Sequence, residues 1–263
     1  MPFVIQNGAR IYWKLEGERS NPPLVLLNSI GSDMDLWAPV LPLLRPHFAL
    51  LRIDTRGHGA SDAPHGDYSM TELADDVTAV MDEAGIDAAI IAGVSLGGMI
   101  AMQLALDTPR RVTGLAAICT SATMDPAAWA VRVDTVRTGG LVAIADLAMG
   151  RFLSPAFIAQ HPDVAATVRR GLLLSSPAGY AGCGAAIRDM ALVERLGEIA
   201  CPTLVVTGTL DTSTPFEGHG EHLIAGIKNA RHVALDAAHL APLDAPEALA
   251  SALRSFLPVG DIR

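Results

Sequence analysis

Cysteine is scarce in this sequence, and long apolar runs are absent from it. The 263 residues include three cysteines, Cys119, Cys183 and Cys201, and an odd number at such wide spacing excludes a disulfide framework and a cysteine-rich zinc pattern. No stretch approaches the roughly 20 consecutive apolar residues of a membrane span, and the first residues lack the basic flank and apolar run of a secretory signal. We therefore expect a cytoplasmic protein whose thiols are reduced.

Basic residues are also few compared with acidic ones. Lys and Arg number 19 against 28 Asp and Glu, which gives a formal net charge of -9. A nucleic-acid-binding protein needs a basic face to displace phosphate counterions, and an anionic membrane surface attracts basic segments. The sequence therefore predicts neither nucleic acid nor membrane as a partner. Half of the residues are apolar and only 18% are charged, so there is ample material for a buried core.

Short apolar runs of strand length alternate with amphipathic segments of helical spacing. Leu73, Val77 and Val80, for example, recur at intervals of three and four within residues 71–81. Runs that are apolar on both faces suit strands in the middle of a sheet that helices cover on each side. This alternation predicts an α/β fold with a mostly parallel sheet and right-handed crossovers. The predicted strands are residues 3–6, 9–15, 24–27, 48–53, 88–92, 112–119, 203–207 and 230–235, and the predicted core helices are residues 71–81, 96–106 and 246–257.

The alternation stops between residues 121 and 196, which contain no clear strand. A helical insertion between two strands of an open sheet predicts a lid over the carboxyl ends of the strands, where ligands bind in such sheets. We therefore expect a core formed by residues 1–120 and 197–263 and a helical lid formed by residues 121–196. The helical pieces predicted in the lid are residues 126–138, 141–149, 155–160, 163–174 and 180–191.

A serine flanked by glycines at residues 93–97 has the surroundings of a catalytic nucleophile. The predicted strand 88–92 comes directly before this pattern, and a predicted helix begins at Leu96. A strand, a sharp turn and a helix together form the nucleophile elbow, which projects the serine hydroxyl above the sheet. The two glycines are needed because side chains would collide across the turn. We predict that Ser95 is the nucleophile.

Such a nucleophile works with two backbone N–H groups that bind the oxyanion of the intermediate. The first donor is the residue after the serine, here Leu96, and the second comes from a loop after an earlier strand. Residues 28–31 follow the predicted strand 24–27 and fit that loop. We predict an oxyanion hole formed by the N–H groups of Ile30 and Leu96.

A serine hydroxyl becomes nucleophilic when a histidine accepts its proton and a carboxylate orients that histidine. In α/β enzymes with a nucleophile elbow, the acid comes after the serine along the chain, and the histidine comes after the acid. Asp211 comes just after the predicted strand 203–207, and His239 comes just after the predicted strand 230–235. Asp125, beyond the strand 112–119, is an alternative acid. We predict a triad of Ser95, Asp211 and His239 that requires no metal and no organic cofactor.

The other histidines are interpreted as structural. His58 precedes the nucleophile and lies in a loop after a strand, so we expect it to brace that loop near the site. His219 and His222 are three residues apart, as in a metal-binding pair, but no third ligand accompanies them. We therefore expect these two to be solvated surface residues.

Several of these segments resemble the α/β-hydrolase superfamily, namely residues 54–62, 95–99 and 236–239. They are most similar to its 3-oxoadipate enol-lactonase branch, and residues 179–190 of the predicted lid resemble that branch too. The resemblance implies an α/β-hydrolase fold and cleavage of a carboxylic ester or lactone through an acyl-enzyme, above all that of 3-oxoadipate enol-lactone in aromatic degradation. Gly184, Ala191 and residues 240–244 depart from the pattern of the branch beside the expected pocket.

An enol-lactone with a free carboxylate implies a cation in the pocket. The predicted lid contains the candidates Arg132, Arg137, Arg151 and Arg188, of which we take Arg132 and Arg188, together with Trp129, as substrate-binding residues. Three alternatives share the same sequence features. They are a general carboxylesterase, a cofactor-free perhydrolase that forms peracids from the acyl-enzyme, and a ligand receptor that has kept a hydrolase fold.

Overall fold

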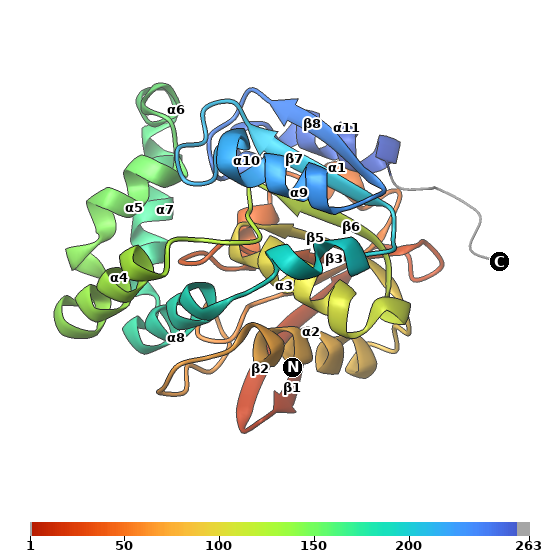
Figure 1. Ribbon diagram of the computed structural model, residues 1–263, viewed down its shortest axis with the longest axis horizontal. Helices are drawn as coiled ribbons and strands as arrows, with labels where there is room; N and C mark the ends of the chain where they lie inside the picture. Colours follow the sequence, from red (N-terminus) through yellow and green to blue (C-terminus); the bar gives the residue numbers. More distant parts are fainter. Residues whose placement is uncertain (1, 257–263) are drawn as a thin grey trace.

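The computed structural model describes residues 2–256, which are organised around one eight-stranded sheet (Figure 1). The strands lie in the order β1-β2-β4-β3-β5-β6-β7-β8. All eight predicted strands are present, and their ends differ from the prediction by two residues or fewer. Their bounds are β1 Phe3–Gln6, β2 Ala9–Glu16, β3 Pro23–Leu27, β4 Ala49–Ile53, β5 Ala89–Val94, β6 Val112–Ile118, β7 Thr203–Gly208 and β8 Ala230–Leu235.

The sheet is antiparallel at one edge and parallel elsewhere. β1 pairs with β2, and β2 with β4, in antiparallel fashion, whereas β4, β3, β5, β6, β7 and β8 are mutually parallel. At the β1–β2 turn, Asn7 and Gly8 have φ angles of 48° and 77°. A two-residue hairpin turn of type I′ requires this pair of left-handed conformations. The predicted mostly parallel sheet is confirmed.

Helices cover both faces of the sheet. α2 and α3 pack together on one face, and α1 and α11 pack together on the other (Figure 1). Within residues 2–256, none of the helices combines the length and the apolar character needed to cross a bilayer. Leu257, predicted at the end of the last helix, lies outside the described residues. The core helices and short turns are η1 Met34–Trp37, α1 Leu41–Leu44, α2 Met70–Glu83, α3 Leu96–Asp107, η2 Pro109–Arg111, η4 Val193–Glu198, η5 Phe216–Gly220, α9 Glu221–Gly226, α10 Ala241–Asp244 and α11 Pro246–Phe256.

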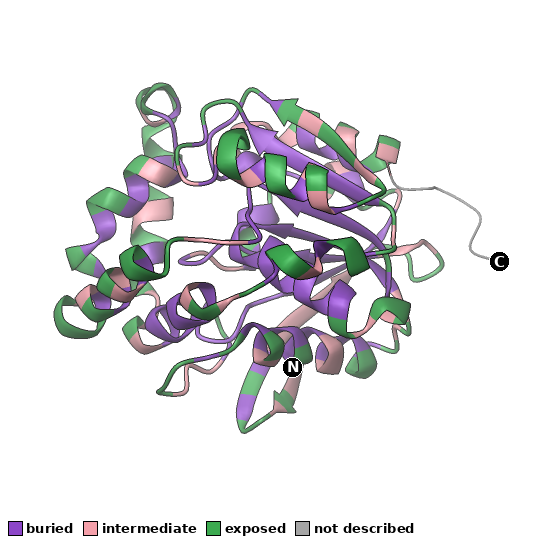
Figure 2. Ribbon diagram, in the orientation of Figure 1, coloured by how far each residue is buried: buried purple, intermediate pink, exposed green. Residues whose placement is uncertain are grey.

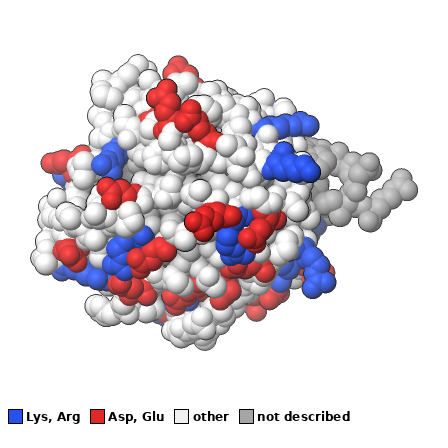
Figure 3. All heavy atoms as spheres, viewed as in Figure 1, with Lys and Arg blue, Asp and Glu red and all other residues white. Residues whose placement is uncertain are grey.

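Burial follows the position of each strand in the sheet. Every residue of β4, β5 and β7 is buried, because these strands have a strand on each side and helices above and below (Figure 2). β8 is an edge strand, and Arg231 and His232 on it are exposed. On the face of the molecule in Figure 3, basic and acidic side chains are interspersed, and no continuous basic surface is visible there.

Five helices between β6 and β7 form an insertion, residues 126–189, at one end of the sheet (Figure 1). The last of them begins at Pro177, three residues before the predicted start. The reason is local, because Ser176 Oγ accepts a hydrogen bond of 3.2 Å from Gly179 N–H and a proline at the first helical position needs no N–H partner. The elements of the insertion are α4 Pro126–Gly139, η3 Leu141–Ala143, α5 Ala145–Phe152, α6 Pro155–Gln160, α7 Pro162–Leu174 and α8 Pro177–Asp189.

Helix α8 rests directly on the loop that follows β4. A Cβ added to Gly57 would lie 2.5 Å from Gly179 Cα, and one added to Gly179 would collide with the backbone of Gly57. The Tyr68 N–H also donates to the Gly182 carbonyl at 3.2 Å. Backbone therefore touches backbone at this contact, which fixes α8, and the helices packed on it, relative to the sheet.

The variant Gly179→Ala is expected to lower the free energy of unfolding by about 1–3 kcal/mol, because its methyl group meets backbone that cannot swing aside. Urea unfolding followed by circular dichroism measures the effect. Gly171→Ala on α7 is the matched control, since nothing lies within 4 Å of its added Cβ. A gain of about 0.5–1 kcal/mol is expected there from the greater helix propensity of alanine. Equal stabilities of the two variants would contradict the close contact.

Candidate active site

Ser95 occupies a sharp turn between β5 and α3. Its φ and ψ angles are 55° and -116°, which lie outside the regions that residues with a side chain ordinarily adopt. A Cβ on Gly97 would lie 2.5 Å from the Leu27 carbonyl oxygen, and one on Gly93 would collide with the backbone of Gly97. Both glycines are therefore required for the turn, as the sequence pattern predicts.

The backbone of this turn is held from both sides. Ser95 N–H donates to the Ile118 carbonyl at 2.9 Å, and Thr120 Oγ1 donates to the Ser95 carbonyl at 2.6 Å. The N–H groups of Gly98 and Met99 donate to the same carbonyl, at 2.9 and 3.1 Å. These four bonds hold the strained conformation of Ser95, and such strain is typical of functional sites.

Asp211 and His239 form a buried pair. Asp211 Oδ2 lies 2.9 Å from His239 Nδ1 and also accepts a hydrogen bond of 2.9 Å from Thr214 Oγ1. The other carboxylate oxygen, Oδ1, accepts from the N–H groups of Ser213 and Thr214, at 2.7 and 3.1 Å. Burial alone would raise the pKa of Asp211, but the charge of His239 and these hydrogen bonds outweigh it and hold the pKa below its ordinary value.

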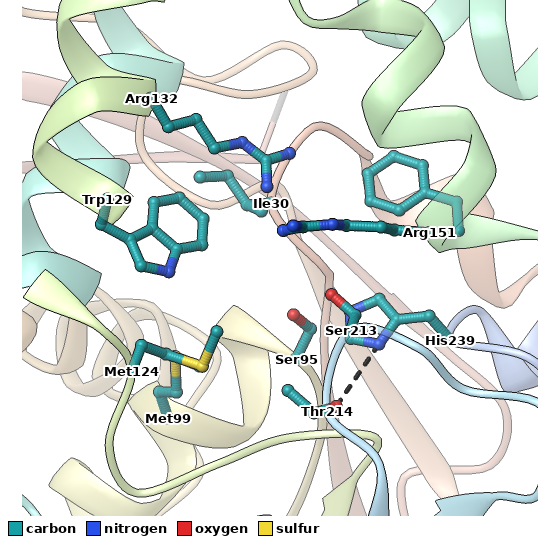
Figure 4. Close-up of a pocket in the computed structure, with 11 residues that line it drawn as sticks. Ile30, Ser95, Met99, Met124, Trp129, Arg132, Arg151, Ser213, Thr214 and His239 are labelled. Atoms are coloured by element: carbon teal, nitrogen blue, oxygen red, sulfur yellow. Dashed lines mark hydrogen bonds between the residues drawn. The ribbon is translucent and has the colours of Figure 1, made fainter. Parts of the chain in front are cut away.

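A small pocket brings Ser95 and His239 together (Figure 4). Their side chains are not hydrogen-bonded to each other, and such catalytic bonds are often long without substrate and tighten when it binds. The free space in the pocket is about 10 Å³, room for roughly one water molecule. The residues that line it come from the core and from α4 and α5 of the insertion, and they are Ile30, Ser95, Met99, Met124, Trp129, Arg132, Arg151, Phe152, Ser213, Thr214 and His239.

The two N–H groups predicted for the oxyanion hole have no partner within the described part of the chain. Leu96 is the first residue of α3, where an N–H has no acceptor in its own helix. Ile30 lines the pocket in the loop after β3. That loop is tied to the loop after β4, because Asn28 Nδ2 donates to the Ile53 carbonyl at 2.8 Å and Gly31 N–H donates to His58 Nε2 at 2.9 Å.

The amino-acid sequence is similar to a known protein family and to proteins of known activity. Residues 22–139 match the family described as the alpha/beta hydrolase fold. Over 242 residues the chain is 31% identical to 3-oxoadipate enol-lactonase 2 of Acinetobacter baylyi, an alignment that covers 92% of this chain and 90% of that protein. The chain belongs to the α/β-hydrolase family.

Solved structures of α/β hydrolases agree with this assignment. The enol-lactonase from Burkholderia xenovorans LB400 is 34% identical and superposes with a TM-score of 0.94, over 97% of this chain and 99% of that one. A thermophilic esterase from Thermogutta terrifontis, solved with malate bound, is 27% identical with a TM-score of 0.89, over 97% and 95% of the two chains. The expected fold and the expected class, an ester or lactone hydrolase, are thus confirmed at the level of the family.

Two arginines of this α/β hydrolase reach the pocket, and only one of them is among the substrate-binding residues that the sequence predicts. The guanidinium of Arg132 lies 4.9 Å from the centre of the Trp129 ring, so the predicted residues Arg132 and Trp129 do lie together in the pocket. Arg151 is the second pocket arginine (Figure 4). Among residues 2–256, neither arginine forms an ion pair with a carboxylate.

The placement of Arg188 in the pocket is wrong. Arg188 lies in the last turn of α8 and binds Asp67 at 2.9 Å and Asp189 at 2.6 Å. Arg137 likewise pairs with Asp67. The reason is its place at the C-terminal end of α8, where the buried run 179–187 stops and the carboxylates of Asp67 and Asp189 are within reach. Asp67 is 121 positions away in the sequence, so the sequence alone does not reveal this pairing.

The other histidines lie partly where the sequence predicts. His58 accepts a hydrogen bond from the loop after β3 and so does brace a loop beside the site. His219 is not a free surface residue, because its Nδ1 lies 2.8 Å from Ser121 Oγ and burial lowers its pKa. No cluster of three or more metal-binding side chains occurs in the described part of the chain.

Sequence reasoning missed Thr214, whose hydroxyl bonds Asp211 and lies 3.5 Å from His239 Nδ1 (Figure 4). A signal for it was present. An aspartate followed within three residues by Ser and Thr is typical of a turn in which the carboxylate accepts the next N–H groups.

Proposed function

We propose that this protein is a serine hydrolase that opens a carboxylated lactone, with 3-oxoadipate enol-lactone as the leading candidate. The observation that carries the proposal is a pocket in which Ser95 and His239, the latter paired with Asp211, lie close to two arginines that have no ion-pair partner among residues 2–256. The names of the relatives, 3-oxoadipate enol-lactonase and enol-lactonase, support the choice of substrate.

The acylation step follows from the geometry of the pair. Asp211 accepts from His239 Nδ1–H, so Nε2 is the free base that faces the pocket. Ser95 Oγ attacks the lactone carbonyl while His239 Nε2 accepts its proton. The oxyanion is bound by the N–H groups of Ile30 and Leu96. When the intermediate collapses, the ring C–O bond breaks and His239 returns the proton to the leaving oxygen.

Water then releases the product. His239 accepts a proton from a water molecule, the resulting hydroxide attacks the acyl carbon, and the bond to Ser95 Oγ breaks with return of the proton to Ser95. The product carries a new carboxylate. The N–H groups of Ile30 and Leu96 stabilise the second oxyanion as they do the first, so one hole serves both steps.

We propose that the insertion acts as a lid, with residues 121–196 as its extent and residues 1–120 and 197–263 as the core. The free space of about 10 Å³ holds about one water molecule, so a lactone enters only if side chains of α4 or α5 move outward. Phe152 of α5 stacks parallel to the His239 ring, with 6.3 Å between ring centres. Closure over the substrate would exclude water and strengthen the electrostatic interactions inside.

The two pocket arginines are the proposed site for the free carboxylate of the substrate. A guanidinium without a carboxylate partner in a nearly closed pocket is costly alone and is satisfied by an anionic ligand. Arg132 Nε is buried and has no hydrogen-bond partner in the part of the chain that the structure describes. The Thermogutta terrifontis esterase, a relative, was solved with a dicarboxylate, malate, bound.

Arg132→Gln and Arg151→Gln are each expected to lower kcat/KM for a carboxylated lactone by about 10- to 100-fold, through the loss of a charge-assisted hydrogen bond. Hydrolysis of a neutral lactone of the same ring size should change little. Steady-state assays on the two substrates measure the difference.

Arg188→Gln is the matched control, because Arg188 lies outside the pocket and pairs with Asp67 and Asp189. It should leave both substrates unaffected. Equal losses on the carboxylated and the neutral lactone in the pocket variants would contradict the carboxylate site. They would favour the second candidate, a general carboxylesterase, which the similarity to the Thermogutta terrifontis esterase supports.

A further inference from the structure

The imidazole of His58 is buried between two loops and takes no part in the proton transfers described above. Its exposed fraction is 2%. His58 Nε2 accepts a hydrogen bond of 2.9 Å from Gly31 N–H, and Nδ1 lies 3.2 Å from the Arg56 carbonyl oxygen. The ring therefore links the loop after β4, which contains His58, to the loop after β3, which contains Ile30.

The partners determine which nitrogen of His58 carries the proton. An N–H and a carbonyl have fixed roles, so Nε2 must be the acceptor for Gly31, and Nδ1 must carry the hydrogen that is donated to Arg56. Burial lowers the pKa of His58 to about 4, which keeps the ring neutral at ordinary pH. A neutral ring in this single tautomer accepts from Gly31 permanently.

We infer that His58 is a positioning residue for the oxyanion hole, acting through Gly31 on the N–H of Ile30. The inference rests on the proposed function, since it assumes that Ile30 binds the oxyanion. Gly31 directly follows Ile30 and has a φ angle of 77°, a left-handed conformation that lets the loop turn back immediately after the donor. The bond to His58 fixes the peptide unit between these two residues and so limits rotation of the donor.

Other contacts hold the loop before and after the donor. Asn28 Nδ2 donates to the Ile53 carbonyl before Ile30, and Met34 N–H donates to Asp54 Oδ1 after it, both at 2.8 Å. Closer to the donor, the Ser29 carbonyl accepts from Ser32 N–H at 3.2 Å and from Ser32 Oγ at 2.8 Å, which holds the peptide group on one side of Ile30. The bond from Gly31 N–H to His58 holds the peptide group on the other side. Loss of the His58 bond would leave the peptide group between Ile30 and Gly31 with one long contact, 3.5 Å from Ser29 Oγ to the Ile30 carbonyl, and so would loosen the loop on that side of the donor.

His58 is itself firmly held. Its N–H donates to the Thr55 carbonyl at 2.8 Å, and its carbonyl accepts from Ser61 N–H at 3.0 Å. Arg56, whose carbonyl receives the Nδ1 proton, is anchored by its guanidinium to Asp76. The imidazole is thus a rigid acceptor mounted on a rigid loop, as accurate positioning of an oxyanion donor requires.

Two substitutions of similar length separate positioning from packing. In His58→Gln the amide oxygen of the glutamine can take the place of Nε2 and accept the hydrogen bond from Gly31 N–H. In His58→Met the side chain fills a similar space, but its sulfur is only a weak acceptor. For His58→Met we expect kcat to fall about 10- to 100-fold, since complete loss of an oxyanion donor typically costs about 100- to 1,000-fold. KM should change little, and His58→Gln should recover most of kcat. Thermal unfolding shows whether each variant is folded.

A trifluoromethyl ketone analogue of the substrate gives a second readout, because it forms a hemiketal oxyanion on the serine. Its affinity should fall with kcat in His58→Met and return in His58→Gln. An unchanged kcat in folded His58→Met, or equal losses in both variants, would overturn the inference. So would ¹⁵N NMR of the wild-type protein showing the proton of His58 on Nε2, a measurement that needs no variant. If Ser95→Ala retained full activity, the proposed function would fail instead, whatever the His58 variants did.

Discussion

Ser95→Ala is expected to lower kcat for hydrolysis of lactones and of p-nitrophenyl acetate by about 10⁴- to 10⁶-fold, with the protein still folded. Ser95 Oγ is the atom proposed to form the acyl bond, and the turn that exposes it is held by backbone contacts that alanine keeps. Steady-state kinetics measures the loss. Mass spectrometry after treatment with a fluorophosphonate should find the label on the peptide that contains Ser95 in the wild type and none in the variant.

Ser251→Ala on the exposed side of α11 is the control, because it removes a serine hydroxyl that does not line the pocket. It should leave kcat and labelling unchanged. Retention of activity within about tenfold in Ser95→Ala would exclude the acyl-enzyme mechanism. A wild-type protein that binds lactones or esters and turns over none of them would favour the ligand receptor.

Asp211→Asn should lower kcat by about 10³- to 10⁴-fold. The backbone N–H groups of Ser213 and Thr214 bind Oδ1, so the oxygen of the new amide would take that place and its NH₂ group would face His239 Nδ1. His239 would then have to accept at Nδ1 and carry its proton on Nε2. In that tautomer it cannot take the proton of Ser95. Stopped-flow measurement of the acylation rate with p-nitrophenyl acetate tests this directly, because the proton of Ser95 is transferred in the acylation step.

Asp236→Asn is the matched control, since Asp236 is an exposed carboxylate directly after β8. Its kcat should equal that of the wild type. Activity of Asp211→Asn close to the wild-type value would contradict the role of Asp211 and would direct attention to Asp125, the alternative acid. Asp125 instead caps α4 in the structure, where Oδ1 accepts from Ala127 N–H at 2.9 Å.

The positions of Ser95, Asp211 and His239 could be predicted because each depends on a short segment of chain. Each residue follows a strand that the sequence reveals as a short apolar run. The carboxyl ends of parallel strands meet at one edge of the sheet, so the three residues are brought to the same edge. The elbow is the clearest case, since the glycines at positions 93 and 97 are needed by contacts within the turn and with the neighbouring strand β3. Local rules therefore sufficed to place the three residues of the proposed triad.

The sequence by itself thus determined which segments form strands, the elbow at Ser95 and the family, whereas the order of the strands in the sheet came from the structure. Only the tertiary structure decided which side chains surround the reacting groups. Arg188 pairs with Asp67, 121 positions away, while Arg132 and Arg151 face the pocket. These outcomes depend on how the insertion helices pack on distant parts of the chain, as α8 does on the loop at Gly57. The acceptor role of His58 likewise arises between two loops that meet only when the sheet is assembled. A contact between two segments that are far apart in the sequence produces no periodic pattern of residues in either segment.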